Sequence, residues 1–442
     1  ILDCAAIVGS EFSFDYVEVM ADLQESELVS AIDELIDKGI IEISSQLHQP
    51  LRYKFNQTFV RDVVLQGLSQ THKQVLHKYL ADNLLLSIIQ KKTADEIADI
   101  GYHLGSAGKV EQAFQYWIEA AELFNNTDIN QKANHAYEQA YLLSQNHNFN
   151  FTDEHLYKLW VGWGELANKM NDFKSAVEYY HHVVKEGLRR NSSLLIGSGL
   201  SGEGYLYLMR GLPGKAKQYL ERAALYLKEG SVSEYIRNSI RMMLTHLYYF
   251  DLQASITEYE SIAWLESQMK TDNDHLIFAS LQSTLALTYT LAGKFKEAEI
   301  EANKSIQTAI RLNNPTLRIE NEFSLGLGYY YQGAYQESLE KFGLVTQMAE
   351  SNFYWRFVLE SISVINRVFL ALGKTYQCFE NIQNGFTLAK IYQYKSMHSI
   401  LINSEARLYL AFGKYEKAIT LFEEALKFSN NKRNTLLNEM WV

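Results

Sequence analysis

Two glycine-rich segments of the sequence have residue types that bind phosphate groups. Gly197-Ser-Gly199-Leu-Ser-Gly202 has the spacing of a dinucleotide fingerprint, and Gly373-Lys374-Thr375 is similar to the end of a phosphate-binding loop. The fingerprint works only between a strand and a helix, where backbone amides face a pyrophosphate, but this segment lies inside an expected helix. The second segment lacks its upstream glycine, because Val368 stands there. We therefore assign the first segment to helix packing and expect no ATPase activity from this chain alone.

Histidines, cysteines and carboxylates form no arrangement typical of catalysis or metal binding. His181 and His182 are adjacent, so on a helix they point about 100° apart and do not share one ion. Cys4 and Cys378 lie far apart in the sequence, which predicts no disulfide framework and fits a reducing cytoplasm. The carboxylates fall on outer faces of expected helices, where solvation is their ordinary role. We expect a chain that is not an enzyme and holds no metal or cofactor of its own.

A repeated pattern positions the remaining candidate residues. A small or polar turn residue is followed five positions later by a small residue at positions 108, 171, 211, 293, 333, 373 and 413, and Phe250 with Ser255 is a poor copy of the same pattern. Most steps are 40 residues, as from Gly293 to Gly333. A fixed period of this size predicts stacked helical hairpins. We predict a mainly α fold, with a right-handed superhelical solenoid over residues 94–442 and a solitary helix at 128–146.

Three of the repeats resemble the tetratricopeptide repeat (TPR). Trp160-x-x-Trp163-Gly164, Leu325-Gly326-x-x-Tyr329 and Gly413-x-Tyr415-x-x-Ala418 match its consensus positions. The resemblance covers about residues 94 to 429, and the period of 40 residues exceeds the usual 34, which implies longer helices. It also implies a groove lined by the first helix of each hairpin, which would hold a peptide, a protein or a small-molecule inducer.

Arg367 and Arg407 are the groove residues best suited to binding. They occupy the same position of adjacent repeats, and neighbouring first helices should pack roughly 10 Å apart, so both could reach one anionic group. The guanidinium fork suits a carboxylate or a phosphate. The alternative is that an acidic side chain of the groove neutralises the arginines. The other residues expected to face the groove are Asn403, Tyr330, Glu360, Glu320 and Phe323. Glu360 and Glu405 are the acidic candidates for this pairing.

Residues 1–70 do not follow the repeat and predict a winged-helix-like domain, joined to the solenoid by a bridging helix at 71–93. The pattern gives three helices, two strands, and a closing helix. Their expected bounds are 1–8, 14–20 and 24–38 for the helices, 40–44 and 51–55 for the strands, and 58–68 for the closing helix. The third helix carries five carboxylates against Lys38 alone, so phosphates would repel it, and we expect no DNA binding.

This N-terminal region resembles the segment that follows the ATPase core in signal-transduction ATPases with numerous domains (STAND). The matching segments are Cys4-Ala-Ala-Ile-Val-Gly-Ser-Glu-Phe12, Ile32-Asp-Glu-Leu-x-x-Lys-Gly-Ile40 and Tyr53-Lys-Phe-Asn-Gln57-Thr-Phe-Val-Arg-Asp-Val-Val64. Members include the bacterial maltose regulator and the predicted-ATPase modules of class III nucleotide cyclases. The resemblance places Gln57 at the nucleotide-sensing position, where the family has a histidine. Glutamine can donate a hydrogen bond there but cannot become a cation.

Together these features predict a non-catalytic sensor region of a multidomain STAND ATPase. The chain begins at Ile1 without Met, so we expect a fragment whose upstream nucleotide-binding domain would hold ATP or ADP and contact the winged helix. The net charge of −11 argues against nucleic acid, and no stretch approaches the roughly 20 apolar residues that span a membrane. We expect a cytoplasmic protein. The alternatives are a plain TPR scaffold, or a regulatory C-terminal region of a nucleotide cyclase or kinase.

Overall fold

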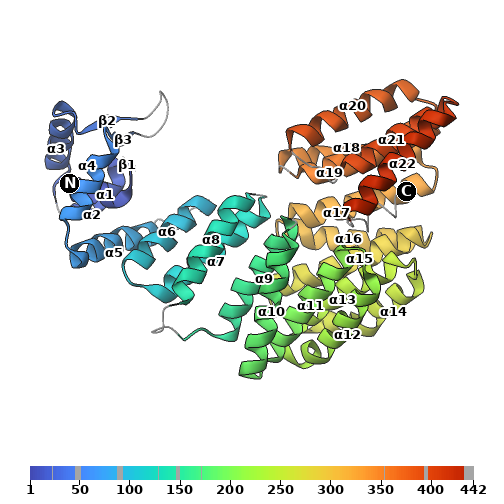
Figure 1. Ribbon diagram of the computed structural model, residues 1–442, viewed down its shortest axis with the longest axis horizontal. Helices are drawn as coiled ribbons and strands as arrows, with labels where there is room; N and C mark the ends of the chain where they lie inside the picture. Colours follow the sequence, from blue (N-terminus) through green and yellow to red (C-terminus); the bar gives the residue numbers. More distant parts are fainter. Residues whose placement is uncertain are drawn as a thin grey trace. The chain divides into compact units, whose positions relative to one another are not determined.

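The computed structural model describes residues 1–21, 23–44, 51–86, 93–127, 129–145, 150–170, 172–352, 354–392 and 397–432. The described chain is mostly helical and divides into two compact units (Figure 1). Unit 1 comprises residues 1–152 and unit 2 comprises residues 153–442.

Unit 1 begins with helices around a small sheet. The elements are α1 (Leu2–Val8), β1 (Glu11–Ser13), α2 (Phe14–Met20), α3 (Glu25–Asp37), β2 (Ile41–Ile43), β3 (Arg52–Phe55) and α4 (Thr58–Gly67). The antiparallel sheet has the order β1-β3-β2, with Phe12 opposite Tyr53. The sequence analysis missed β1, because a three-residue strand shows too little alternation to be recognised. Its Phe12 side chain is buried and stacks on Tyr53, which ties β1 to the core.

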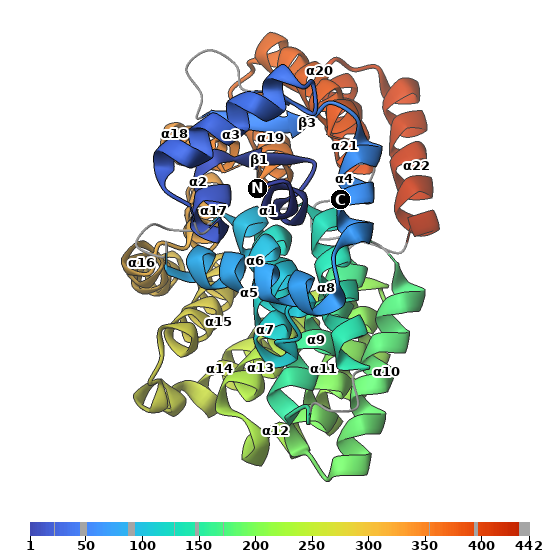
Figure 2. The ribbon, with the colours of Figure 1, turned by 90° about the vertical axis from the view of Figure 1, so that its left-hand side faces the viewer.

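Four helices complete unit 1: α5 (Gln70–Leu86), α6 (Ala94–Ser106), α7 (Val110–Asn126) and α8 (Asn130–Ser144) (Figure 2). Helix α8 occupies the segment expected to hold a solitary helix, and it packs against α7. The part of the expected bridging helix from residue 87 to residue 92 lies outside the described residues.

Helices α5 and α6 bury a pair of histidines. The Nδ1 atoms of His77 and His103 lie 2.8 Å apart, so one nitrogen donates a proton to the other. Burial lowers the pKa of His77 to about 4, and the positive charges of Arg61 and Lys73 act in the same direction. Burial, with His77 beside it, lowers the pKa of His103 to about 3. Both imidazoles are therefore neutral in the folded chain at neutral pH.

The described residues of unit 2 form a stack of seven helical hairpins. The hairpins are α9 (Asp153–Lys169) with α10 (Phe173–Arg190), α11 (Ser193–Met209) with α12 (Pro213–Gly230), α13 (Val232–Tyr248) with α14 (Leu252–Ile262), α15 (Asp272–Leu291) with α16 (Phe295–Arg311), α17 (Pro315–Tyr331) with α18 (Tyr335–Ser351), α19 (Trp355–Ala371) with α20 (Thr375–Ile391), and α21 (His398–Ala411) with α22 (Tyr415–Lys432). A 3₁₀ helix, η1 (Ala263–Gln268), follows α14.

The first helices of these hairpins form one layer. Each contacts the first helix of the next hairpin, whereas successive second helices make fewer contacts with one another. The stack therefore curves with its first helices on the inside (Figure 1). We call α9, α11, α13, α15, α17, α19 and α21 the first-helix layer.

The tight turns fall where the chain adopts a left-handed backbone. Six of the expected turn glycines have positive φ, at positions 108, 211, 293, 333, 373 and 413. Phe250 takes the same conformation, with φ 54°, although it has a side chain. The expected turn residue at position 171 lies outside the described residues. A left-handed backbone costs a non-glycine residue roughly 1–2 kcal/mol, so the α13–α14 turn is under strain.

We expect Phe250→Gly to stabilise the chain by about 0.5 kcal/mol or more, since relief of strain exceeds the entropy that glycine adds to the unfolded state. Phe250 is 60% exposed, so little packing is lost. Urea unfolding measures the change. Tyr249→Gly is the matched control, because Tyr249 is similarly exposed but has φ −89° and should become less stable. A loss of stability in Phe250→Gly would show that the left-handed backbone at Phe250 is not strained.

The glycines of α11 serve packing, as the sequence analysis predicted. A Cβ atom at Gly197 would lie 2.5 Å from Cγ of Leu227, and one at Gly202 would lie 2.3 Å from Cε1 of Tyr180. Helix α11 can approach both α10 and α12 only because these side chains are absent. The segment is helical throughout, so its amides bond within the helix and do not face a phosphate.

Candidate ligand-binding surface

Buried polar side chains gather in the first-helix layer of unit 2. The second helices α10 to α22 bury few polar side chains among the described residues, and those are short serines such as Ser255, Ser305 and Ser338. The first helices also bury longer and charged side chains, including Glu203, Glu234, Asn238, Arg241, Gln282, Asn321, Glu322, Glu360, Asn366 and Asn403. Burying such groups is costly unless they find partners, so their recurrence on one layer requires organised networks.

The first network joins α9, α11 and α13 through Arg241. Its Nη2 donates to Oε1 of Glu165 at 2.9 Å, and its Nη1 donates to Oγ of Ser201 at 3.1 Å. The guanidinium also lies over the ring of Tyr205, 5.2 Å from the centroid. One arginine therefore ties three successive first helices together and fixes the orientation of the Tyr205 ring.

Glu234 forms a second part of this network. It accepts a hydrogen bond of 2.6 Å from the hydroxyl of Tyr157, and its carboxylate lies 3.0 Å from Nε of Arg237. Burial raises the pKa of Tyr157 well above its ordinary value, with the negative charge of Glu234 adding to the effect. The tyrosine therefore stays protonated and continues to donate at any physiological pH.

A further charged group lies on α17 and α19. Nε of Arg356 is 2.8 Å from Oε1 of Glu360, and the charge of Glu360 raises the pKa of Arg356. Glu320 contacts solvent, but the protein around it displaces bulk water and raises its pKa to about 7, with Arg356 opposing and Glu360 reinforcing the rise. A side chain that is both solvent-accessible and surrounded by protein is typical of a concave surface.

Tyr205 connects this group to the first network. Tyr205 is one of the groups that raise the pKa of Arg356, although α11 and α19 are four hairpins apart in the chain. The curvature of the first-helix layer therefore brings side chains from distant hairpins near one another. The sequence alone gave no sign of this proximity, because the repeat defines only the relation of adjacent hairpins.

The structure brings Arg367 of α19 and Arg407 of α21 close together. Burial lowers the pKa of Arg367, and the positive charge of Arg407 lowers it further. Nε of Arg407 donates to Oδ1 of Asn403 at 3.0 Å. Tyr330 and Tyr331, at the end of α17, act on the pKa of Arg367 in the opposite direction.

The other groove candidates take different positions. Phe323 is 9% exposed and packs edge-on against Phe342, so it belongs to the core and the prediction that it faces the groove is wrong. Tyr330 is half-buried, with its ring 5.3 Å from that of Tyr331. Glu360, one of the two candidates for neutralising the arginine pair, binds Arg356 instead. Periodicity misplaced Phe323 because one helical position can point either into the hairpin or along the groove.

Gln57 lies in unit 1, at the residue preceding α4. It is exposed and extended, with φ −138° and ψ 125°. Arg61, one turn later, donates from Nε to the backbone carbonyl of Ala6 at 2.9 Å and so joins α4 to α1. The sequence analysis did not identify this structural bond, since nothing in the sequence pairs position 61 with position 6.

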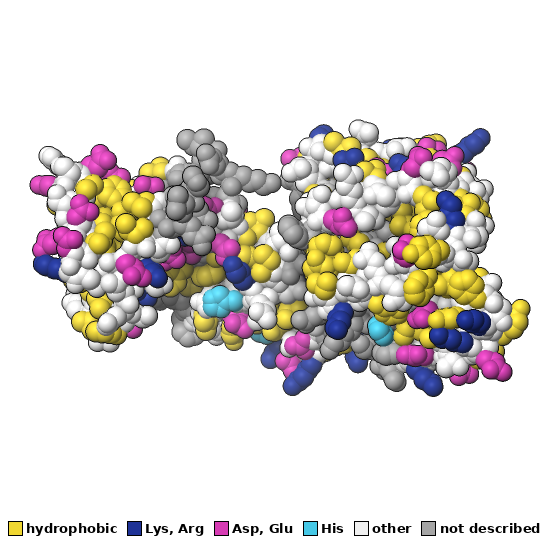
Figure 3. Space-filling model, turned by 90° about the horizontal axis from the view of Figure 1, so that it is seen from above, with side chains coloured by type: hydrophobic (Ala, Val, Ile, Leu, Met, Phe, Trp, Pro, Cys, Tyr) yellow, Lys and Arg dark blue, Asp and Glu magenta, His cyan; other side chains and the backbone are white. Residues whose placement is uncertain are grey.

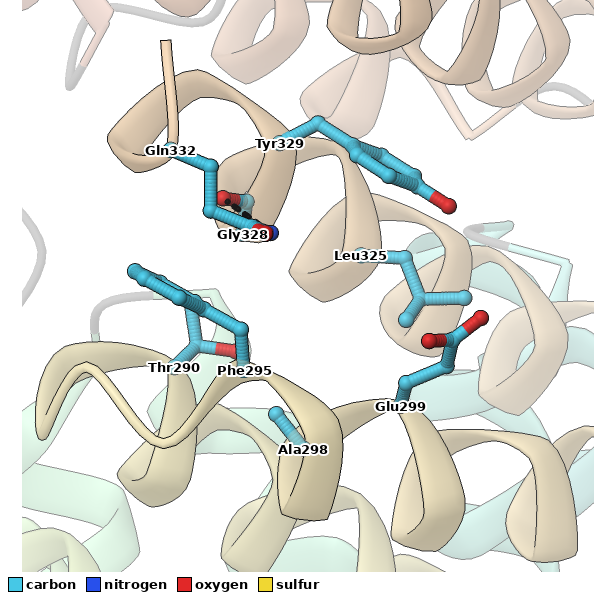
Figure 4. A pocket seen from close by; sticks show the side chains of 8 residues that line it. All are labelled: Thr290, Phe295, Ala298, Glu299, Leu325, Gly328, Tyr329 and Gln332. Atoms are coloured by element: carbon cyan, nitrogen blue, oxygen red, sulfur yellow. Dashed lines mark hydrogen bonds between the residues drawn. The ribbon is translucent and has the colours of Figure 1, made fainter. Parts of the chain in front are cut away.

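A narrow crevice opens between the α15–α16 hairpin and helix α17 (Figure 4). It is lined by Thr290, Phe295, Ala298, Glu299, Leu325, Gly328, Tyr329 and Gln332. Nε2 of Gln332 donates to the carbonyl of Gly328 at 3.1 Å. The crevice has room for about one water molecule, so it does not suit an organic ligand.

On the face in Figure 3, lysines and arginines of unit 2 are interspersed with carboxylates. No group of three or more potential metal ligands occurs in the described part of the chain. Among the helices described, none is long and apolar enough to cross a bilayer. Cys4 and Cys378 are both buried, and neither forms a disulfide.

Sequence comparison identifies one repeat directly. Residues 406–434 match the tetratricopeptide repeat family. No curated protein sequence matches the chain significantly. The chain thus contains a tetratricopeptide repeat within a larger helical stack.

Solved structures with a similar fold extend over most of the chain. A STAND protein with a tetratricopeptide repeat sensor from Pyrococcus horikoshii matches with a TM-score of 0.57 and 12% identity, covering 99% of this chain and 65% of that protein. A Rap protein complexed with competence and sporulation factor matches at 0.55 and 13%, covering 84% and 95%. The Rap conjugation gene regulator of plasmid pLS20, in complex with the Phr* peptide, matches at 0.54 and 14%, covering 89% and 96%. The chain therefore has a TPR-like solenoid fold resembling sensor and protein-binding regions.

Proposed function

We propose that this chain is a non-catalytic sensor region whose first-helix layer in unit 2 binds a peptide or a segment of a partner protein. The observation that carries the proposal is the concentration of buried, hydrogen-bonded polar side chains on that layer. Such side chains are held in fixed orientations, so they can recognise a ligand without losing much further entropy. Two proteins with this fold support the same use of the surface: one is complexed with the Phr* peptide and the other with competence and sporulation factor.

The N-terminal elements support a winged-helix unit belonging to a STAND ATPase. Their order and the β1-β3-β2 sheet are those expected of a winged helix. Phe59 and Val63, one turn apart on α4, are 61% and 60% exposed, which suits contact with an upstream nucleotide-binding domain. In this proposal that domain holds ATP or ADP, the protein is cytoplasmic and the hairpins wind in a right-handed sense. Ligand binding would then favour one state of the ATPase.

Site-specific cross-linking tests the peptide-binding surface. A photoreactive amino acid is placed at Tyr205, on the first-helix layer, or at Ile300, which is 55% exposed on the second helix α16. Peptides selected from a random displayed library against the whole chain are then irradiated with each variant. We expect cross-links at Tyr205 and none at Ile300. Equal labelling at both positions, or labelling at Ile300 alone, would place binding outside the first-helix layer.

A plain scaffold is the rival function, and it uses the same surface. The two functions differ in whether binding changes the state of an attached domain. In a STAND ATPase that contains this region, the selected peptide should change the rate of nucleotide hydrolysis. A peptide that binds but leaves hydrolysis unchanged would favour the scaffold.

A further inference from the structure

We infer that Nε2 of His181 is a phosphoryl-acceptor site, and that the buried carboxylate of Glu203 positions the imidazole for this reaction. His181 lies on the second helix α10, whereas peptide binding is assigned to the first-helix layer. The inference therefore goes beyond the proposed function and does not depend on it. The donor is a small phosphoryl compound with a good leaving group, either an acyl phosphate or a phosphoramidate.

Glu203, on α11, holds the imidazole from one side. Its Oε1 lies 3.1 Å from Nδ1 of His181, and the Glu203 side chain is 6% exposed whereas the His181 side chain is 74% exposed. Because a carboxylate can only accept a proton here, the neutral imidazole keeps its proton on Nδ1 and its lone pair on Nε2. A carboxylate bound to one ring nitrogen also makes the other nitrogen more basic. His181 thus presents an oriented nucleophilic nitrogen to solvent.

Helix α12 supports the same carboxylate. Burial raises the pKa of Glu203, and the charge of His181 opposes this rise, together with a hydrogen bond from Tyr219 and the charge of Arg222. The guanidinium carbon of Arg222 lies 5.6 Å from the centre of the Tyr219 ring. Glu203 therefore has one donor on α10 and another on α12, so it stays in place when the charge of His181 changes.

Phosphoryl transfer to Nε2 creates a positive charge that Glu203 can stabilise. The Nε2 lone pair forms a bond to phosphorus, and the bond from phosphorus to the leaving atom breaks. The electron pair of that bond departs with the carboxylate of an acyl phosphate, or with the ammonia of a protonated phosphoramidate. The ring keeps its Nδ1 proton and becomes cationic, and the carboxylate already accepts that proton. Lys185, one turn after His181 on the same helix face, adds a positive charge that attracts the donor.

Two other histidines of the described chain lack this arrangement. The His135 side chain is 62% exposed, but its Nδ1 lies 4.0 Å from Glu138, whose side chain is itself 50% exposed. The His182 ring packs 4.3 Å from the ring of Trp160, and burial lowers the pKa of His182. His181 is therefore distinguished by its buried carboxylate as well as by its exposure, and His135 is its matched control.

Potassium phosphoramidate is the probe that tests the site on the whole chain. Peptide mass spectrometry at alkaline pH, where phosphohistidine is stable, measures the phosphorylation of each histidine. We expect His181 of the folded chain to react about tenfold or more faster than His135, and the two to react at similar rates in concentrated urea. Equal rates in the folded chain would overturn the inference. This comparison needs no variant, so it holds whether or not a substitution impairs folding.

Glu203→Gln tests the positioning role. Glutamine is similar in size and can still accept from Nδ1, but it carries no charge, so His181 should react about tenfold more slowly. His135 should react at its wild-type rate, and the helical circular dichroism should be unchanged. Nitrogen NMR gives a readout that folding alone does not move: His181 should be protonated at Nδ1 in the wild-type chain and should lose this preference in Glu203→Ala. An unchanged rate in Glu203→Gln, or a wild-type ring protonated at Nε2, would overturn the inference.

Discussion

Gly202→Ala should destabilise the chain by about 1–3 kcal/mol, since the added methyl group meets a side chain that has no room to move. The Cβ position lies 2.3 Å from Cε1 and 2.4 Å from Cδ1 of Tyr180. Tyr180 is fully buried between α10 and α11, so its ring can give way only if the helices separate. Chemical denaturation followed by circular dichroism measures the loss.

A double-mutant cycle separates this clash from the general effect of alanine in a helix. Tyr180→Leu alone should be destabilising, because it leaves a cavity. Combined with Gly202→Ala it should cost less than the sum of the two changes, since leucine frees the space that the methyl group needs. Gly343→Ala is the matched control: Gly343 lies within α18 with no atom within 4 Å of its Cβ position, and alanine should stabilise by roughly 0.5–1 kcal/mol. If the two changes in the free energy of unfolding simply add, the methyl group at position 202 does not clash with the Tyr180 ring.

Acidification from pH 7 to pH 4 should cost the chain several kcal/mol through His77 and His103. In the unfolded chain both residues titrate near pH 6.5, whereas in the folded chain their pKa values are about 4 and about 3. Between these limits the unfolded state binds protons that the folded state excludes, so stability falls as the pH falls. Well above pH 6.5 both states are neutral and the pair contributes no pH dependence. Urea midpoints measured across this range give the slope.

Replacing both residues with asparagine tests whether this pair causes the slope. Asparagine keeps a donor and an acceptor near the Nδ1 positions but does not titrate, so the decline between pH 7 and pH 5 should become shallower. His135→Asn serves as the control, because the His135 side chain is 62% exposed and should leave the slope unchanged. An equal slope in the double variant would show that other groups, such as carboxylates, govern the acid sensitivity.

The binding surface combines residues that the repeat relates with residues that it does not. Arg367 and Arg407 are adjacent because they share one position of a 40-residue period. Arg241, Glu165 and Ser201 also lie on successive first helices, but their bonds depend on rotamers that no pattern specifies. A ligand that contacts both sets of residues would therefore meet one set whose positions the sequence repeat predicts and another whose positions depend on side-chain packing.

The sequence by itself predicted the helical hairpins, the positions of most helices and the packing role of the α11 glycines. It could do so because helix ends, glycine turns and pairs of small and large residues involve positions close in sequence, and each repeat shows them again. Tertiary structure alone decided that Phe323 is core, that Glu360 binds Arg356 and that Tyr205 lies near Arg356. It also decided the His77–His103 pair and the short strand β1. These features depend on contacts between side chains that are distant in sequence and on the curvature of the stack. The curvature results from the packing angles of many helix pairs, so no single sequence position predicts it.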